Sequence, residues 1–427
     1  MSEPVGFFSS VFIRFRTAYG LTAALKKFLL NSFVLLCALV FCLLLCEGTF
    51  YLLDKLSPLE KQEIETVSST PNEERLDFFQ YDSVFGIAGL PNVQKEFYGK
   101  LITHNARGLR GPELDYKKPP NTIRIAFIGD SQTWGWSVAD DETIPSYTAS
   151  LLNGSKLKSK VEVLNFGVTG YGIGQSYLRL ISEGLRYQPD FVVLTYFADN
   201  DIWESTSYEA WGIEKPYFYE KRPGRQLCVS NIPPRRATGW PSDNIGHMVK
   251  DWKVGIAGLE FDLADTYTAQ YFKNRSFSSS LMGLFGNNDD PIAAINREIG
   301  CLQAGPGPLL KNWNAKMDFT TRLIYVTRDT VEKYGGRFIL VAKPLPDDYR
   351  NGTRHYDYDY VLRRLELSHI DLIDLYPAAR RADLTPEQFF LGAGHLTARG
   401  NHLAAEKVAE EVRHLLEDTR TASQAVF

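Results

Sequence analysis

The stretch from residue 123 to residue 133, IRIAFIGDSQT, joins a short apolar run to a Gly-Asp-Ser turn. A short apolar run that is bounded by turn residues is typical of a strand buried in a parallel sheet. The carboxyl end of such a strand is the edge at which ligands usually bind in an open α/β sheet. We therefore expect Ser131 to lie at this edge, in a turn that exposes its hydroxyl group.

Similar apolar runs recur along the chain and alternate with segments whose apolar residues have three- and four-residue spacing, as in amphipathic helices. The predicted strands are 123–128, 161–166, 191–197, 338–342 and 370–375, and the predicted helices are 143–152, 175–185, 315–334 and 400–417. Strands that alternate with helices indicate an α/β fold, a parallel-sheet α/β/α sandwich with helices on both faces.

This alternation stops between residues 205 and 313, in a segment rich in aromatic residues, glycine and proline. The pieces on either side of it have together the length of one ordinary domain. We therefore interpret 205–313 as an insert in a body that spans 76–427. Two roles remain open for the insert: a lobe or lid over the site, and structural elaboration.

An uncharged apolar run near the N-terminus, residues 28–46, is about as long as a helix that crosses a bilayer. Lysine and arginine residues are concentrated before it, so the positive-inside rule places residues 1–27 in the cytoplasm. The end of the run lacks a small-residue cleavage site. We predict an uncleaved transmembrane anchor over 28–53, a tether over 54–75 and a body that faces the periplasm or the exterior.

Composition and charge exclude several classes of protein. The chain has 427 residues, of which 44% are hydrophobic and 23% charged, and this excludes a disordered polymer. A net charge of −4 provides no basic surplus for phosphates, so no nucleic-acid partner is expected. Cys228 and Cys301, the two cysteines of the body, form either a disulfide or two separate buried thiols. The absence of a CxxC motif or a Cys/His cluster argues against zinc, and no cofactor is expected.

Three further segments lie where chemistry is expected. The glycine-rich residues 165–172 follow the second strand and form either a loop whose N–H groups approach a ligand or a merely flexible connection. Asn200 follows the third strand, where its amide donates into the crevice or caps a helix. His395 precedes the last helix and therefore lies on a loop. The occurrence by chance of Ser, Gly, Asn and His in this order at such positions is much less probable than the occurrence of any one of them.

These four segments resemble the SGNH hydrolase superfamily, also called GDSL esterases, whose named blocks have the same order. The matching positions are residues 129–133 (GDSQT), Gly170, Asn200 and His395. The resemblance implies that Ser131 is a nucleophile whose proton is taken by His395. It also implies an oxyanion hole formed by the backbone N–H groups of Ser131 and Gly170 and by the Asn200 amide.

The last block departs from the pattern of the superfamily. An aspartate normally stands three residues before the histidine, whereas this chain has Gly392 at that position, followed by Ala393. An acid orients the imidazole and stabilises its cationic form, so a different group is needed for that task. The candidates are a backbone carbonyl and the carboxylates of Asp383, Glu387 and Asp199.

Two other features lie close to the serine block. Residues 104–113, HNARGLRGPE, are similar to the segment that precedes this block in membrane-anchored bacterial members of the group. Trp134 and Trp136 follow Ser131 and have two interpretations. They line a pocket wall, where aromatic faces suit sugar rings, or they pack beneath the first helix.

Together these features predict a membrane-anchored serine esterase of SGNH type that acts on an acylated extracytoplasmic carbohydrate. An O-acyltransferase of a surface polysaccharide is an alternative, because transfer and hydrolysis share the acyl-serine intermediate. A lipase or thioesterase, and a catalytically degenerate glycan-binding or scaffold protein, are the others. The expected partners are an acylated glycan or other ester substrate, the membrane through the N-terminal helix, and proteins of polysaccharide modification.

Overall fold

The computed structural model describes most of the body of the chain. The described residues are 77–210, 212–221, 226–232, 234, 253–256, 259–262, 291–303, 308–368, 370–391 and 394–425, with a few positions between 31 and 45. Contacts divide the chain into two units, residues 67–244 with 274–427, and residues 1–66 with 245–273. The second unit contains the hairpin of β12 (Lys253–Ile256) and β13 (Leu259–Asp262), and all other labelled elements belong to the first.

The predicted anchor and tether fall largely outside this description. Most of 28–53 and all of 54–75 lie among the residues that are not described. Among the helices that are described, none combines the length and the apolar character that a membrane crossing requires. The proposed anchor, tether and domain boundaries therefore stay predictions.

A five-stranded parallel sheet forms the centre of the body, with the strand order β16-β15-β7-β5-β6. Its strands are β5 (Thr122–Ile128), β6 (Lys160–Asn165), β7 (Phe191–Phe197), β15 (Arg337–Lys343) and β16 (Asp371–Asp374). Every strand predicted from the apolar runs is present, with ends that differ by one residue at most. The parallel α/β prediction is confirmed.

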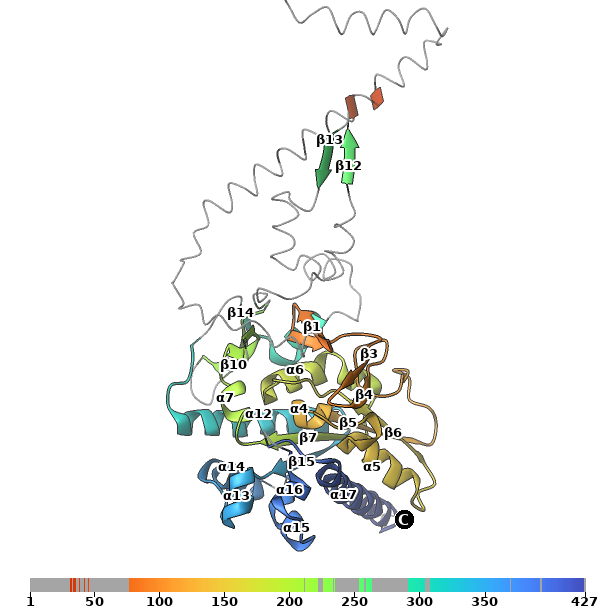
Figure 1. Ribbon diagram of the computed structural model, residues 1–427, viewed down its shortest axis with the longest axis vertical. Helices are drawn as coiled ribbons and strands as arrows, with labels where there is room; N and C mark the ends of the chain where they lie inside the picture. Colours follow the sequence, from red (N-terminus) through yellow and green to blue (C-terminus); the bar gives the residue numbers. More distant parts are fainter. Residues whose placement is uncertain are drawn as a thin grey trace, which may run out of the picture. The chain divides into compact units, whose positions relative to one another are not determined.

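Helices cover both faces of this sheet (Figure 1), with α6 and α12 on one side and α5, α15 and α17 on the other. Their bounds are α5 (Ile144–Asn153), α6 (Ile173–Ser182), α12 (Trp313–Lys333), α15 (Leu375–Arg381) and α17 (Ala398–Ala425). Side chains alternate between the faces of a strand. In β5, Ile125 and Phe127 pack with α5 and α17, whereas Ala126 and Ile128 pack with α6 and α12. The core is therefore two apolar layers separated by the sheet.

Short helices complete the body. They are α4 (Ser131–Trp134), α7 (Asp201–Glu204), α13 (Pro346–Asn351), α14 (Tyr356–Glu366), α16 (Pro386–Phe389), and the 3-10 helices η1 (Asp140–Glu142) and η2 (Gly184–Tyr187). Two of these, α4 and α7, directly follow the carboxyl ends of β5 and β7. The helices α16 and α17 flank the loop that carries His395.

Apart from the β12–β13 hairpin, which belongs to the second unit, the described parts of the insert 205–313 add to the body beside α6. They are β8 (Glu209–Ala210), β9 (Ile213–Glu214), β10 (Tyr217–Glu220), β11 (Leu227–Ser230), α11 (Pro291–Ile299) and β14 (Leu302–Gln303). A three-stranded sheet has the order β10-β11-β14, and α11 contacts α6. A disulfide joins Cys228 to Cys301, so these two residues pair rather than remain separate thiols.

Two hairpins precede the sheet and were not expected from the sequence. The first consists of β1 (Phe79–Asp82) and β2 (Gly86–Gly89), and the second of β3 (Gln94–Phe97) and β4 (Lys100–Thr103). Each strand has four residues, which is too short for a clear alternation of apolar and polar positions. Aromatic residues of this region pack around Trp134, namely Phe78, Phe79 and Phe97.

Candidate active site

Ser131 lies where β5 ends and α4 begins. Gly129 immediately after the strand has a φ of +151°, and a Cβ atom there would lie 2.3 Å from the Thr133 hydroxyl oxygen, so glycine is required. Asp130 caps α4, because its carboxylate accepts a hydrogen bond from the backbone N–H of Gln132 at 2.8 Å. Ser131 is the first residue of α4, so no carbonyl group of this helix accepts a hydrogen bond from its backbone N–H.

His395 meets this serine from the other end of the chain. The hydroxyl oxygen of Ser131 and Nε2 of His395 are 2.8 Å apart, although 264 positions separate the two residues in sequence. The backbone N–H of Leu391 donates to the His395 carbonyl at 2.6 Å, and Phe390 and Leu396 form a β-bridge around the loop. At this distance a neutral imidazole whose proton is on Nδ1 accepts the proton of the hydroxyl group.

Two side chains support the loop of His395. The indole of Trp136 stacks on the imidazole, with ring centroids 5.5 Å apart and planes inclined by 19°. The ammonium of Lys343, at the end of β15, donates to the carbonyl of Gly394, the residue that precedes His395. This ammonium also lies 3.2 Å from the centre of the Phe197 ring.

Lys343 is almost completely buried, with 2% of its surface exposed. Burial lowers the pKa of Lys343 to about 7, against the opposing influence of the carboxylates of Asp130, Asp199 and Asp201. The cation at the His395 loop is therefore close to its titration point at neutral pH. Sequence reasoning missed this residue, because a lysine at the end of an apolar strand usually marks the boundary with solvent.

Asn200 lies beside the serine block, and its side-chain amide donates hydrogen bonds to two carboxylates. Its Nδ2 donates to the carboxylate of Asp130 at 2.9 Å and to that of Glu204 at 3.1 Å. Burial raises the pKa values of Asp130 and Asp201, the latter strongly and with a further contribution from the Asp130 charge. The structure thus places Asn200 next to Ser131, and its donation to an oxyanion stays a prediction.

The glycine-rich second block packs directly against α4. Asn165 donates to the carbonyl of Thr133 at 3.0 Å and accepts from the N–H of Gly167 at 2.9 Å. A Cβ atom on Gly167 would lie 2.3 Å from the backbone nitrogen of Trp134, so only glycine permits this approach. Gly170 has a φ of +81°, and its N–H stays a predicted oxyanion donor.

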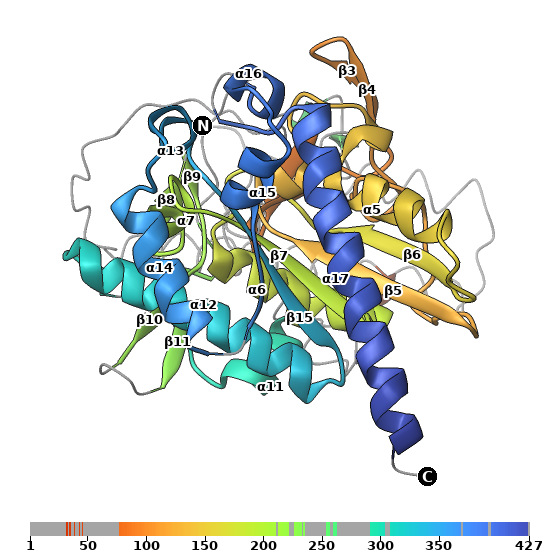
Figure 2. The same cartoon turned by 90° about the horizontal axis from the view of Figure 1, so that it is seen from below.

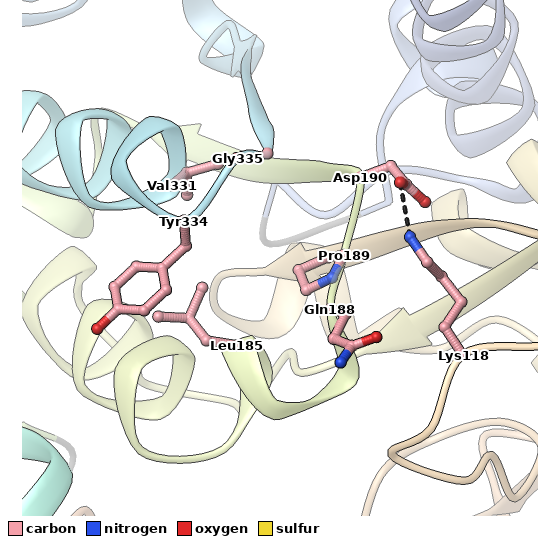
Figure 3. A pocket seen from close by; sticks show the side chains of 9 residues that line it. Lys118, Leu185, Gln188, Pro189, Asp190, Val331, Tyr334 and Gly335 are labelled. Carbon is pink, nitrogen blue, oxygen red and sulfur yellow. Dashed lines mark hydrogen bonds and ion pairs between the residues drawn. The ribbon is translucent and has the colours of Figure 1, made fainter.

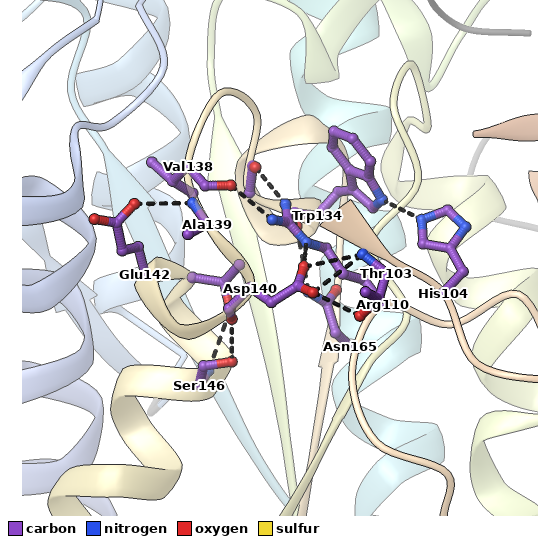
Figure 4. Close-up of polar contacts among 12 residues, drawn as sticks. Thr103, His104, Arg110, Trp134, Val138, Ala139, Asp140, Glu142, Ser146 and Asn165 are labelled. Carbon is purple, nitrogen blue, oxygen red and sulfur yellow. Dashed lines mark hydrogen bonds and ion pairs between the residues drawn. The ribbon is translucent and has the colours of Figure 1, made fainter. Parts of the chain in front are cut away.

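The upstream segment 104–113 fixes the loop that follows α4 (Figure 4). The buried guanidinium of Arg110 donates to the carbonyls of Trp134, Gly135 and Val138 and to the carboxylate of Asp140. The distances to Trp134 and Val138 are 2.9 Å and 2.6 Å. Because Trp136 belongs to this loop, Arg110 also determines where the indole meets His395.

His104 holds the same loop through the indole of Trp134. Trp134 donates from Nε1 to Nε2 of His104 at 3.0 Å, and Nδ1 of His104 lies 3.1 Å from the carbonyl oxygen of Leu90. An indole N–H only donates and a carbonyl only accepts, so His104 is neutral with its proton on Nδ1. Burial lowers the pKa of His104 to about 4, which keeps this arrangement intact at neutral pH.

The two tryptophans have different roles. Trp134 is 1% exposed, so the pocket-wall interpretation is wrong for it and the packing interpretation is correct. Trp136 is only partly buried and stacks on His395, so it belongs to the site. Sequence spacing alone did not distinguish them.

The candidates for the group that orients His395 in place of the usual aspartate are a backbone carbonyl and three carboxylates. Gly392 and Ala393 lie outside the described residues. Among the named carboxylates, Asp383 follows α15, Glu387 is in the first turn of α16 and Asp199 is exposed at the end of β7. The proposed partnership of each with His395 stays a prediction.

A separate pocket of about 230 Å³ lies at the opposite edge of the sheet (Figure 3). Pro189 and Asp190 in its wall directly precede β7, and Gly335 and Gly336 directly precede β15. Asp190 forms an ion pair with Lys118 at 2.6 Å in the wall of this pocket. Since Ser131 and His395 lie at the carboxyl edge, this pocket is not part of their site.

No protein-family model matches the chain, and no curated protein does. Several solved structures are similar to it. A member of the lipolytic G-D-S-L family from Veillonella parvula has 14% identity and a TM-score of 0.34, over 68% of this chain and 97% of that one.

An acetylxylan esterase from Geobacillus stearothermophilus has 12% identity and a TM-score of 0.36, over 68% of this chain and 94% of that one. A two-domain esterase active on acetylated mannans has 12% identity and a TM-score of 0.34, over 70% of this chain and 50% of that one.

Proposed function

We propose that this protein is a serine esterase of SGNH type that acts on an acylated extracytoplasmic carbohydrate and is anchored to a membrane by its N-terminal segment. One observation carries the proposal: the 2.8 Å contact between the Ser131 hydroxyl and Nε2 of His395. A serine hydroxyl is a weak nucleophile until a positioned base accepts its proton, and this contact supplies that base.

The reaction begins when Ser131 attacks the ester carbonyl while its proton passes to Nε2 of His395. The negative charge then develops on the former carbonyl oxygen, and the predicted donors for it are the N–H groups of Ser131 and Gly170 and the Asn200 amide. When the tetrahedral intermediate collapses, the ester C–O bond breaks and His395 gives the proton to the departing sugar oxygen, which leaves as a hydroxyl group. Water then attacks the acyl-serine by the same route and releases the acid.

Three further observations support the carbohydrate, the compartment and the anchor. The partly buried indole of Trp136 lies beside the catalytic imidazole, and an aromatic ring is a suitable surface for a sugar. The Cys228–Cys301 disulfide fits a protein that folds in an oxidising compartment. The apolar run before the body and its flanking cations support an anchor with this orientation.

An active-site fluorophosphonate probe tests the nucleophile. We expect labelling of the folded protein and its loss in Ser131→Ala, because the probe reacts only with an activated serine. Ser146→Ala is the matched control, since this serine hydroxyl donates to a backbone carbonyl and lies in α5. Equal labelling of wild type and Ser131→Ala, or no labelling of either, would refute the esterase proposal.

Product analysis then separates hydrolysis from transfer. We expect wild-type protein to release acetate from acetylated oligosaccharides, and Ser131→Ala to release none. A sugar acceptor should leave this acetate yield unchanged if water is the natural acceptor. If acetate instead appears on the added sugar as an ester, the protein is an acyltransferase with the same acyl-serine intermediate.

Localisation is tested with the full-length chain in cells. We expect the body to remain in the membrane fraction after a salt wash and to be degraded by a protease added outside the cytoplasmic membrane. Deletion of residues 1–53 should release it from the membrane fraction. A body that the protease reaches only after lysis of the cytoplasmic membrane would overturn the proposed orientation.

A further inference from the structure

An exposed tyrosine at the tip of the β3–β4 hairpin lies beside the indole that stacks on His395. Tyr98 is 62% exposed, and its ring centroid is 6.4 Å from that of Trp136. Phe97 packs edge-on against both rings, with centroids 4.5 Å from Tyr98 and 4.8 Å from Trp136. Because Trp136 also stacks on His395, a continuous aromatic surface leads from the catalytic base to the hairpin tip.

The hairpin projects from the body at the edge where α17 begins, the edge to which the carboxyl ends of the strands point (Figure 2). His395 lies just before α17 and at the same edge. A substrate whose ester group is at Ser131 therefore has the hairpin tip beside it. A long substrate extends over Tyr98 more readily than a small one.

Tyr98 occupies a backbone conformation that tyrosine does not favour. The pairing of Phe97 with Lys100 leaves Tyr98 and Gly99 as a two-residue turn, with φ values of +49° and +71°. Such turns favour Asn-Gly, and bulky residues seldom adopt a positive φ. A mostly exposed tyrosine here has an unfavourable backbone conformation and gains little burial in return. An outlier of this kind is more easily explained by function than by folding.

The geometry points to a sugar-binding platform formed by Tyr98 and Trp136, which receives the sugar next to the acylated one. This inference rests on the proposed esterase function and adds a substrate class, an oligomeric glycan rather than a monosaccharide ester. Aromatic side chains with one polar end suit a ligand that has apolar ring faces and hydroxyl edges. Because Trp136 lies between Tyr98 and His395, the Tyr98 ring lowers KM and leaves kcat unchanged.

Tyr98→Asn is the decisive variant, since asparagine favours the left-handed turn and removes the ring. We expect its KM for acetylated xylo-oligosaccharides to rise about tenfold, which corresponds to the loss of one aromatic contact. Its kcat on these substrates, and its kcat and KM on 4-nitrophenyl acetate, should match wild type. Its melting temperature should equal or exceed that of wild type.

Two control variants separate the ring from the hairpin. Tyr98→Phe keeps the aromatic face and should keep the wild-type KM on the oligosaccharides. Leu101 lies on β4 of the same hairpin and is 53% exposed. Leu101→Asn removes this apolar side chain and should also leave the KM on the oligosaccharides unchanged. A rise of KM in Leu101→Asn equal to that in Tyr98→Asn would overturn the assignment to the aromatic platform.

The platform and the esterase proposal fail in different ways. If wild type hydrolyses 4-nitrophenyl acetate through Ser131 but Tyr98→Asn has the wild-type KM on the oligosaccharides, the platform is overturned and the esterase remains. If no ester is hydrolysed, the esterase proposal fails, and the platform is judged by binding of unacetylated xylo-oligosaccharide measured through tryptophan fluorescence. Equal binding by wild type and Tyr98→Asn would then overturn the platform as well.

Discussion

Ser131 and His395 meet at one point but are held there by different means. Ser131 is fixed by the backbone, at a strand end where Gly129 and the capping carboxylate of Asp130 determine the turn. His395 lies on a loop, supported by the side chain of Lys343 and the indole of Trp136. The fold therefore places the proposed nucleophile, whereas individual side chains place the proposed base. Single substitutions are expected to displace the imidazole more easily than the hydroxyl.

A different buried cation supports each of these two residues: Arg110 on the Ser131 side of the site and Lys343 on the His395 side. Arg110 donates to several carbonyls in the loop after Ser131 and stays charged at every physiological pH. Lys343 donates to the one carbonyl before His395 and titrates near neutrality. Loss of Arg110 should mainly affect folding, and loss of Lys343 should mainly affect catalysis.

The largest effect is expected from His395→Gln. We expect kcat on 4-nitrophenyl acetate to fall about 10⁴-fold or more, as when other hydrolases lose a member of the catalytic unit. His402→Gln is the matched control, because this histidine is on α17 with a half-exposed side chain and pairs with Glu406 at 3.3 Å. A comparable loss in both variants, or full activity in His395→Gln, would contradict the assignment of the base.

Among the substitutions of residues that hold the site in place, Arg110→Lys should lower the stability of the fold the most. An ammonium cannot reproduce the planar set of donors, so buried carbonyls lose their partners and the free energy of unfolding falls by about 3 kcal/mol. Urea denaturation measures the change. Arg350→Lys, an exposed arginine that pairs with Asp347 on α13, should shift the unfolding midpoint hardly at all.

Lys343→Met should lower kcat about tenfold through the position of His395, since small displacements of a catalytic group are costly. KM for 4-nitrophenyl acetate should change little, and the rate of fluorophosphonate labelling should fall in parallel with kcat. Lys333→Met, an exposed lysine on α12 that pairs with Glu298, is the control and should retain full activity. Wild-type kcat in Lys343→Met would refute its positioning role.

The sequence predicts the centre of this fold well because the central strands are continuous apolar runs. The β1–β2 and β3–β4 hairpins escaped prediction, since four-residue strands such as Gln94–Phe97 have no clear period. Their aromatic residues become informative only in three dimensions, where Phe97 contacts both Tyr98 and Trp136.

The residues of the site likewise fall into those that the sequence identifies and those that only the structure identifies. Ser131 and His395 were found because their motifs resemble a known family, and the structure brings them together. Lys343 was not found, because its burial arises from packing against Phe197 and the His395 loop, both distant in sequence. Local patterns identify the residues that are proposed to react, and tertiary contacts are needed to identify those that position them.

The last prediction distinguishes the two sides of the site by the pH dependence of folding stability. His104 supports the Ser131 side, and its pKa falls from 6.5 to about 4 on burial. The unfolded chain binds more protons than the folded chain between these values, so folded stability rises with pH from about 4 to 6.5. Relative to His104→Gln, wild type should lose roughly 3 kcal/mol as pH falls through this range.

Lys343 supports the His395 side, and its pKa falls from 10.5 to about 7 on burial. The cost of burying its charge is complete below pH 7 and is relieved as pH rises towards 10.5, because the folded protein then holds the neutral amine. Wild type should therefore gain stability relative to Lys343→Met between pH 7 and 9, in urea denaturation at each pH. Parallel stability curves for wild type and both variants would show that neither buried base titrates in these windows, and the difference between the two sides would then lie in geometry alone.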